Sequence, residues 1–558
     1  MIIPEFLGSL GNLQYLNLAE NSFVGEIPRQ FANLSSLQFI DLGYNVLDVV
    51  NLDWISNLGK LRYLDLTGIS LATVDWLQAV SSLSFLTELH LATCGLAGVS
   101  STTNYSSMAL SIVDLSNNGY VSFSELEWLF NSSSSLVDVD ISNNGLQGPI
   151  PDDFGNMVKL RNLSLASNAL EGKIPESFGK MTFLTNLYLS NNLLQGNIPE
   201  SFGRNLSHLQ WLDLFGNNFD GELQEFLKGL FNGAGATGSL DTLRLESFSQ
   251  VSTLLFLNLA KNRITGTLPD LNYFKSLIKL DLSNNQLRGR LPKSIAQLLD
   301  LELLDVSSNL LNDTVSEAHL SNLSNLKVLH LAYNSLTLEF STNWLPPFQL
   351  DVIRLAYCRL GNHFPKWIQS QNNYSELDIS YAAISDKVPN WFWDLSPRLT
   401  YLNLSYNHLS GSVPDLSSKL VSYSSLDLNS NQFVGSVPSL PPDLTSLHLS
   451  KNMFTGPVSF LCSIANGYFT SLDLSDNKLS GELPDCDETD HQQSKDDNLQ
   501  EDDEDDEDEK VVTTGFYVSL VLGFAVGFWA VFGTLQMKPE WGEHACFKFL
   551  KNTKEGIY

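Results

Sequence analysis

The sequence predicts an α/β-type repeat solenoid, in which short strands from successive coils form one parallel sheet. The first observation is a unit, Leu-x-x-Leu-x-Leu-x-x-Asn-x-Leu-x-Gly-x-Ile-Pro, that recurs about every 24 residues through most of the 558-residue chain. Clean copies run over 160–175, 184–199, 277–292 and 399–414. A repeat of this period is typical of stacked coils. Each coil contacts only its neighbours, so a long chain need not divide into several globular domains.

The second observation is the Leu-x-Leu step, which predicts a strand in every unit. Its leucines point into the core and the residue between them points out, so stacked units form a concave parallel sheet. The Asn that follows is expected to hydrogen-bond buried backbone groups of adjacent coils. It stands at Asn21, Asn45, Asn118, Asn144, Asn168, Asn192, Asn217, Asn262, Asn285, Asn309, Asn334, Asn407, Asn431, Asn452 and Asn477.

Four units depart from this Asn. Cys94 and Cys358 take its position as small buried thiols, whereas Ile69 and Ala382 are expected to weaken the ladder locally. In the Gly-x-Ile-Pro half, Gly allows a tight bend and Pro presets an extended backbone on the convex side. With a degenerate copy at Leu240, about 20 units fill residues 1–486.

The C-terminal end changes composition twice. Residues 487–510 hold 14 acidic residues and two lysines, which predicts a solvated spacer, with an electrostatic contact to a basic partner as the alternative. Residues 511–537 carry no charge and are long enough to cross a bilayer as one helix. Lysines occur in the 538–558 tail, so the positive-inside rule places the tail in the cytosol and the repeats outside. We therefore expect a single-pass protein.

Nine Asn-x-Ser/Thr sequons agree with an outside location for the repeats, although Asn and Ser are abundant enough for some to arise by chance. Two of them, Asn162 and Asn403, fall beside concave strands, where a glycan would obstruct binding. The predicted glycosylation sites are Asn33, Asn104, Asn131, Asn162, Asn205, Asn312, Asn322, Asn373 and Asn403.

Two further features depend on spacing. Cys462 and Cys486 lie 24 residues apart, which is one coil, so we expect either a disulfide between them or two separate thiols. In the apolar segment, Ser519, Gly523 and Gly527 form a small-residue stripe that allows two membrane helices to approach closely.

The concave face offers two candidate groups. The residue between the strand leucines is most often Asp, which raises acid–base catalysis or metal binding as options, but Leu-Asp-Leu-Ser belongs to this repeat type, so we interpret these carboxylates as structural. More selective are four tyrosines at one position of successive coils, with Arg354 and Asp378 beside them. Tyr and Arg are favoured anchors of interfaces, and stacked aromatic side chains also stabilise neighbouring strands. The tyrosines are Tyr333, Tyr357, Tyr381 and Tyr406.

No catalytic motif accompanies these residues. The 21-residue tail is too short for a kinase domain, and neither His-Glu-x-x-His nor Gly-x-Ser-x-Gly occurs. We predict a binding protein that is not an enzyme, without a cofactor or metal and without a nucleic-acid partner.

The Leu-x-Gly-x-Ile-Pro variant resembles the plant-specific subclass of leucine-rich repeats over roughly residues 1–486. With the acidic run and short tail, the chain resembles plant leucine-rich-repeat receptor-like proteins, which lack a kinase. Residues 515–524 and 547–554 most resemble the subgroup that includes receptors for fungal xylanase. The resemblance implies a plasma-membrane receptor that binds an extracellular microbial protein or peptide and signals in defence through a partner receptor kinase.

Three places depart from the family pattern. Residues 1–7 read as the convex half of a repeat, without a signal peptide or a cysteine-bearing cap. About ten residues are missing between Leu240 and Leu254, and Cys486 runs directly into the acidic spacer where further repeats are expected. A truncated decoy and an inhibitor of microbial hydrolases therefore remain alternatives to the receptor. The membrane segment argues against the inhibitor.

Overall fold

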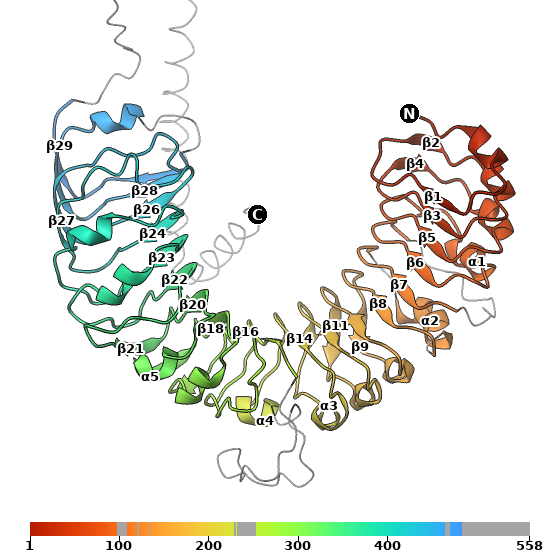
Figure 1. The fold of residues 1–558 in the computed structure, drawn as a ribbon, viewed down its shortest axis with the longest axis horizontal. Helices are drawn as coiled ribbons and strands as arrows, with labels where there is room; N and C mark the ends of the chain where they lie inside the picture. The colour runs from red at the N-terminus through yellow and green to blue at the C-terminus, as the bar shows by residue number, and fades with distance from the viewer. Residues whose placement is uncertain are drawn as a thin grey trace, which may run out of the picture. The chain divides into compact units, whose positions relative to one another are not determined.

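The computed structural model describes residues 1–96, 109–119, 122–132, 134–227, 230, 253–463 and 469–482. Contacts divide the chain into a repeat unit, Met1–Cys486, and a second unit, Asp487–Tyr558, that lies outside the described residues. The coils of the repeat unit stack side by side into a curved solenoid (Figure 1). The predicted repeat solenoid is confirmed.

Short strands line the concave side, one from each coil. Among the described residues they form a single 19-stranded sheet. Every neighbouring pair is parallel, and equivalent residues lie opposite each other, as Leu163 lies opposite Leu187. The strands are β1 (Tyr15–Asn17), β3 (Phe39–Asp41), β5 (Tyr63–Asp65), β6 (Glu88–His90), β7 (Ile112–Asp114), β8 (Asp138–Asp140), β10 (Asn162–Ser164), β12 (Asn186–Tyr188), β14 (Trp211–Asp213), β15 (Phe256–Asn258), β16 (Lys279–Asp281), β18 (Leu303–Asp305), β20 (Val328–His330), β22 (Val352–Arg354), β23 (Glu376–Asp378), β24 (Tyr401–Asn403), β26 (Ser425–Asp427), β28 (Ser446–His448) and β30 (Ser471–Asp473).

Four small parallel sheets flank this main sheet where the chain leaves the concave side. They are β2 (Val24–Glu26) with β4 (Val46–Asp48); β9 (Gln147–Pro149), β11 (Ala169–Gly172) and β13 (Leu193–Leu194); β17 (Arg288–Gly289), β19 (Leu310–Ser316) and β21 (Ser335–Glu339); and β25 (Ser410–Gly411), β27 (Gln432–Ser436), β29 (Met453–Gly456) and β31 (Lys478–Leu479).

Short helices complete the coils on the convex side. Pro28 and Pro175 directly precede two of the 3-10 helices, while Gly25 and Gly172 just before them have φ near +80°, as the Gly-x-Ile-Pro half predicts. The α-helices are α1 (Trp76–Ser81), α2 (Glu127–Asn131), α3 (Glu200–Asn205), α4 (Leu223–Leu227) and α5 (Glu317–Leu320). The 3-10 helices are η1 (Glu5–Ser9), η2 (Arg29–Asn33), η3 (Asp53–Asn57), η4 (Phe123–Leu126), η5 (Asp152–Asn156), η6 (Glu176–Lys180), η9 (Lys293–Gln297), η10 (Lys366–Ser370), η11 (Asn390–Trp393) and η12 (Ser459–Ser463).

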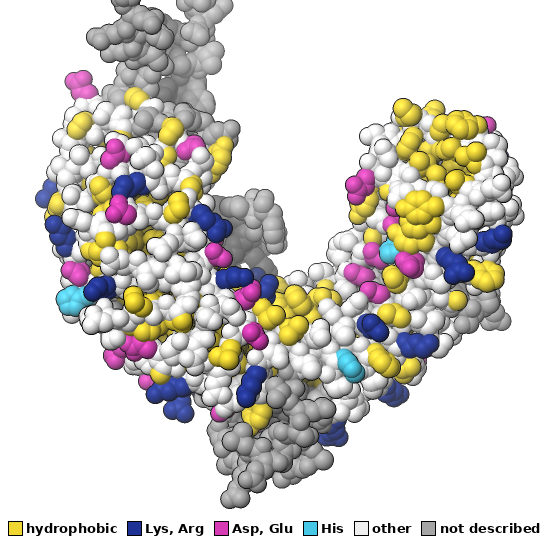
Figure 2. Space-filling model, viewed as in Figure 1, with side chains coloured by type: hydrophobic (Ala, Val, Ile, Leu, Met, Phe, Trp, Pro, Cys, Tyr) yellow, Lys and Arg dark blue, Asp and Glu magenta, His cyan; other side chains and the backbone are white. Residues whose placement is uncertain are grey.

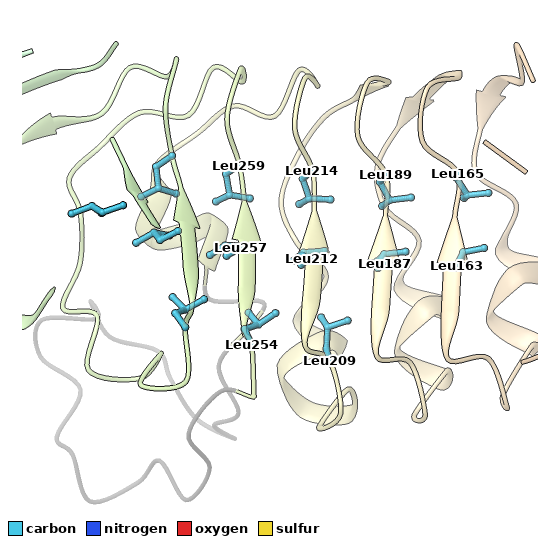
Figure 3. Close-up of a cluster of buried hydrophobic side chains, with 14 of the residues drawn as sticks. Leu163, Leu165, Leu187, Leu189, Leu209, Leu212, Leu214, Leu254, Leu257 and Leu259 are labelled. Carbon is cyan, nitrogen blue, oxygen red and sulfur yellow. The ribbon is translucent and has the colours of Figure 1, made fainter. Parts of the chain in front are cut away.

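The core is a continuous column of leucines between the concave strands and the convex helices. Leu163, Leu187 and Leu212 repeat the same place in successive coils (Figure 3). All three side chains are fully buried. Because each coil buries its leucines against the next, the packing of one coil depends on its neighbours.

The conserved Asn connects each coil to the preceding one, as predicted. Asn118 donates through Nδ2 to the carbonyls of Leu91 (2.9 Å) and Leu115 (2.7 Å). Its Oδ1 accepts from the backbone N–H groups of Cys94 (2.8 Å) and Leu96 (3.3 Å). The side chain therefore gives partners to buried backbone groups in two coils.

The coils that lack this Asn use other partners. The Sγ atoms of Cys94 and Cys358 donate to carbonyls of the preceding coil at 3.2 and 3.3 Å, which confirms the thiols as substitutes. Ala382 offers no side-chain acceptor, so the N–H of Leu360 donates to the Ala382 backbone carbonyl (3.1 Å). The Ile69 N–H likewise donates to Leu66 within its own coil.

One predicted repeat stays a prediction. Strand β14 pairs directly with β15, Trp211 lying opposite Phe256, and the degenerate copy at Leu240 falls in a segment outside the described residues. The concave sheet thus has 19 strands in the described residues where the sequence suggested about 20 units. Residues 231–252 themselves lie outside the described part of the chain.

Within the described residues, no helix is long and apolar enough to span a membrane. The acidic spacer 487–510, the predicted membrane helix 511–537 with Ser519, Gly523 and Gly527, and the tail 538–558 all lie outside the described residues.

Candidate binding surface on the concave face

One position of the repeat, three residues beyond the concave strand, holds Tyr333, Tyr357, Tyr381 and Tyr406. It directly precedes the Asn position, which Cys358 and Ala382 fill in two of these coils. The backbone there is left-handed in almost every coil, and the four tyrosines have φ between 51° and 61°. Gly and Asn adopt this conformation most readily and fill the position at Gly68, Gly216, Asn117, Asn143, Asn191 and Asn284. The other coils have Glu20, Tyr44, Thr93, Ser167, Lys261, Ser308, Ser430, Lys451 and Asp476 there. For a bulky side chain the conformation costs on the order of 1 kcal/mol. Four tyrosines in succession are therefore not explained by backbone preference.

The four rings form one continuous ladder. Ring centroids lie 5.1 Å apart for Tyr333 and Tyr357, 4.2 Å for Tyr357 and Tyr381, and 4.1 Å for Tyr381 and Tyr406. The rings of the last two pairs are stacked nearly parallel, with interplanar angles of 11° and 12°. The side chains are nevertheless 39–53% exposed. The predicted ladder is thus present, and each ring keeps an edge in solvent.

The two charged residues predicted beside the ladder differ in availability. Arg354 on β22 bonds through Nε to Glu376 (2.9 Å), and its side chain remains exposed. Asp378 on β23 is only 9% exposed, and its Oδ1 accepts from Ser380 N (3.0 Å) and Oγ (2.7 Å). Burial raises the pKa of Tyr333, the Asp378 carboxylate adds to the rise, and Arg354 opposes it. The fold brings these groups together, and Arg354 is the more accessible of the two.

The row of concave carboxylates has a backbone role. The Oδ1 of Asp281 accepts from the N–H of Ser283 (3.0 Å), two residues further on. Asn258 makes the same bond in its own coil, to Ala260 (3.0 Å). The bond turns the chain at the strand end, which supports the structural interpretation of these residues. The same bond is made by Asp41, Asp65, Asp114, Asp140, Asp213, Asp305, Asp378, Asp427 and Asp473.

Sequence reasoning missed a second aromatic row, on the first strands of the sheet. Tyr15 stacks on Phe39 (4.2 Å, 14°), and Phe39 stacks on Tyr63 (4.1 Å, 12°). His90 lies against Tyr63 at 5.1 Å. The signal was the 24-residue spacing of Tyr15, Phe39 and Tyr63. These rings fill the first outward position of each strand, whereas the tyrosine ladder fills the position before the Asn, so one pattern does not reveal the other.

The predicted sequons divide by position. Six have exposed side chains away from the concave strands, whereas Asn162 on β10 and Asn403 on β24 lie on the concave sheet and are partly buried. The Nδ2 of Asn403 donates to the Tyr401 hydroxyl (3.2 Å). Asn104 lies outside the described residues. The six exposed sequons are Asn33, Asn131, Asn205, Asn312, Asn322 and Asn373.

The cysteines and possible metal ligands add no chemistry to this surface. Cys94 and Cys358 are free and buried. Cys462 is disulfide-bonded, but Cys486 lies outside the described residues, so their pairing stays a prediction. In the part of the chain that the structure describes, no group of three or more His, Cys, Asp or Glu side chains could hold a metal ion.

Comparison with known proteins agrees with this geometry. The family model described as leucine rich repeat matches residues 11–71 and 159–219, and a second model of that description matches 135–157, 276–298, 398–420 and 468–487. Among solved structures, the ectodomain of the Arabidopsis thaliana receptor kinase GASSHO1/SCHENGEN3 has a TM-score of 0.57 at 28% identity, covering 87% of this chain and 64% of that one. The fold is a leucine-rich-repeat solenoid that resembles the ectodomains of plant receptors.

The relatives narrow this class. Receptor-like protein EIX2 of Solanum lycopersicum is 41% identical over 87% of this chain and 51% of its own length, and Receptor-like protein EIX1 is 42% identical over 79% and 46%. Receptor-like protein 39 of Arabidopsis thaliana is 28% identical over 83% of this chain and 44% of its own length. The chain is thus similar over most of its own length to plant leucine-rich-repeat receptor-like proteins, and these relatives are receptor-like proteins and not enzymes. It spans about half the length of the tomato relatives it matches.

Proposed function

We propose that this chain is a cell-surface receptor-like protein that binds an extracellular microbial protein or peptide and signals in defence through a partner receptor kinase. The similarity to receptor-like proteins supports the receptor class. A receptor kinase of similar fold, Arabidopsis HAESA (TM-score 0.56, 25% identity, covering 87% of this chain and 73% of that one), was solved in complex with a peptide hormone and a co-receptor.

The observation that carries the proposal is the ladder of Tyr333, Tyr357, Tyr381 and Tyr406. Its rings are exposed although the backbone disfavours tyrosine there. Local strain of this kind persists where function requires it, and exposed tyrosines are common anchors of protein interfaces. Arg354 adds an accessible cation beside them. We place the ligand across coils β20 to β24.

A variant of the full-length chain with all four tyrosines changed to serine tests the ladder. Serine fits the left-handed backbone, as at Ser167 and Ser308. The probe is a purified fungal xylanase, the ligand class that the family resemblance implies, and binding is measured by biolayer interferometry. We expect the affinity to fall more than about 30-fold, because interface anchors contribute about 2 kcal/mol or more.

The control is Tyr44→Ser. Tyr44 holds the same position in a coil outside the ladder, so its replacement should leave binding unchanged. A second variant, with all four tyrosines changed to phenylalanine, keeps the stacking and removes the hydroxyl groups. If the serine variant binds normally but melts at a lower temperature, the ladder only stabilises the sheet and the proposed site is wrong.

In this proposal, residues 511–537 cross the plasma membrane once as a helix. Ser519, Gly523 and Gly527 pack against the membrane helix of the partner kinase. Glycans on the six exposed sequons fit an outside location for the repeats. Failure of the full-length protein to co-purify with any receptor kinase from plant membranes would refute the signalling role. Unchanged co-purification of a Gly523→Leu/Gly527→Leu variant would refute the helix contact alone.

A further inference from the structure

A second surface, far along the sheet from the tyrosine ladder, combines a row of exposed and half-buried aromatic rings with acids that form no ion pair among the described residues. It comprises the concave face of strands β1 to β8. Tyr15, Phe39 and Tyr63 stack in one row there, and Tyr15 is 59% exposed. Hydrophobic side chains also gather on the flank of these coils, over β2 and β4 (Figure 2). Stacked rings on an open sheet face form a platform for a partner.

The acids lie in the same strands as the rings. Strands β3 to β8 carry outward carboxylates, and the outward residues of these strands include neither lysine nor arginine. Arg62, directly before β5, is the nearest basic residue in the sequence. The carboxylates belong to Asp41, Asp65, Glu88, Asp114, Asp138 and Asp140.

Ion pairing separates this face from strands β18 to β28 of the sheet. Along the described residues the first ion pair is Glu200 with Arg204, beyond strand β8. Strands β18 to β23 differ, because their carboxylates have partners nearby. Glu302 pairs with Lys327 (3.0 Å), and Asp305 with His330 (2.8 Å).

The unpaired carboxylates also repel one another. Burial raises the pKa of Asp41, and the neighbouring Asp65 adds to that rise. Burial likewise raises the pKa of Asp140, with Asp114 adding to it. A cationic partner would relieve this repulsion. None of the predicted sequons falls on strands β1 to β8, so this face has no predicted glycan of its own.

We infer that the concave face of β1 to β8 binds an extended, arginine- or lysine-bearing peptide segment that lies across the strands. Its cationic groups pair with the carboxylates, and their aliphatic stems pack along the solvent-facing edges of the stacked rings of Tyr15, Phe39 and Tyr63. The spacing favours this occupant. Neighbouring strands lie about 4.8 Å apart, so equivalent carboxylates two coils apart are separated by about 10 Å. Three residues of an extended peptide also span about 10 Å, so a cationic side chain at every third residue can meet a carboxylate in every second coil.

The test uses the full-length chain and a labelled peptide of four Arg-Ser-Gly repeats, with a Gln-Ser-Gly peptide as the neutral control. Binding is measured by fluorescence anisotropy at low and high salt. We expect the arginine peptide to bind, and salt to weaken its binding. The triple variant Asp41→Asn/Asp65→Asn/Asp114→Asn should weaken binding at least about tenfold, a loss of about 1.4 kcal/mol. Asparagine keeps the strand-end bond, as Asn258 does, so these coils keep their backbone bonds.

The matched control is Asp281→Asn/Asp427→Asn/Asp473→Asn, which removes three charges from the same strand position elsewhere on the sheet. It should leave binding within about twofold. The acidic run 501–509 attracts the peptide equally in every variant, so the difference between variants is the readout. A Tyr15→Ser/Phe39→Ser variant tests the rings and should also weaken binding.

Equal weakening by the two triple variants, or equal binding of the two peptides, overturns the inference. This surface is independent of the proposed elicitor site. The fourfold tyrosine-to-serine variant at residues 333–406 should bind the arginine peptide normally, so the two proposals fail separately.

Discussion

Changing Asn118 to alanine tests the main stabilising contact between coils. The side chain is 6% exposed and makes five hydrogen bonds, three donated by Nδ2 and two accepted by Oδ1. Two of its partners, the Cys94 N–H and the Leu91 carbonyl, belong to the preceding coil. Alanine removes every one of these bonds.

The size of the effect follows from the groups that lose a partner. Leu115 keeps a donor, because Asn144 also donates to its carbonyl (2.9 Å). Three backbone groups lose their hydrogen bond to the Asn118 side chain: the N–H groups of Cys94 and Leu96 and the carbonyl of Leu91. Each buried unsatisfied group costs about 1–3 kcal/mol. The coil around Ala382 adjusts its backbone to replace such a bond, so we take the lower part of the sum, about 3 kcal/mol.

Hydrogen–deuterium exchange is the suitable assay, because long repeat arrays do not unfold in one step. Three kcal/mol corresponds to more than about 100-fold faster exchange of the backbone amides in residues 88–96. Asn118→Cys should lie between wild type and alanine, since Cys94 and Cys358 show that a thiol can donate from this position. Asn21→Ala is the matched control, as this exposed Asn donates only within its own coil. An Asn118→Ala effect below about threefold, or one equal to that of Asn21→Ala, would refute the reasoning.

Three further predictions follow from single positions. Ala382→Asn should stabilise its coil by about 1 kcal/mol, because an amide there adds side-chain hydrogen bonds to the preceding coil of the kind that Asn118 makes with Cys94 and Leu91; unchanged exchange at residues 355–360 would contradict this. Asp281→Asn should raise the melting temperature at pH 7 and not at pH 3. Burial, with Asp305 adding to it, raises the folded-state pKa of Asp281, so its contribution is favourable below its unfolded pKa and is lost as pH rises through the folded value; an equal gain at both pH values would count against it. Burial raises the thiol pKa of Cys94 and of Cys358 to about 12, so neither should react with iodoacetamide at pH 8 until the chain unfolds; prompt labelling of the folded protein would show the burial to be wrong.

The repeat made most of the fold predictable, because its pattern names both the strand and the group that joins the strands. Leu163 and Leu165 mark a strand by their alternation, and Asn168 marks the inter-coil bond that follows. Such inferences succeed because one local rule recurs and each coil packs only on the next. The copy at Leu240 stays a prediction, because a weak leucine pattern does not reveal whether a strand pairs with both of its neighbours. In the concave sheet, β14 pairs directly with β15.

The binding surfaces were less predictable, because side chains from different coils meet only after stacking. The run from Tyr333 to Tyr406 was visible as a column of like residues, but its left-handed backbone was not. Arg354 and Asp378 look alike in sequence as outward charges of adjacent strands. Their different exposure depends on Glu376 and Ser380, whose placement requires the folded coil. The Tyr15 row was visible only after the strand register aligned Tyr15 with Phe39.

The Asn position of each coil and the position directly before it are subject to opposite constraints. This contrast indicates which of the two can change to recognise a new ligand. The Asn position is buried and fully hydrogen-bonded, so its replacement disturbs the stack. The position before it projects outward from a left-handed backbone, so a change there leaves the core intact while its conformational cost is paid within one residue. Tyr381 illustrates the point, because its ring is exposed while its N–H still donates to Ser405 of the next coil (3.1 Å). A solenoid can therefore change its surface coil by coil without changing its fold, and aromatic residues at this costly position are the best guide to a selected binding surface.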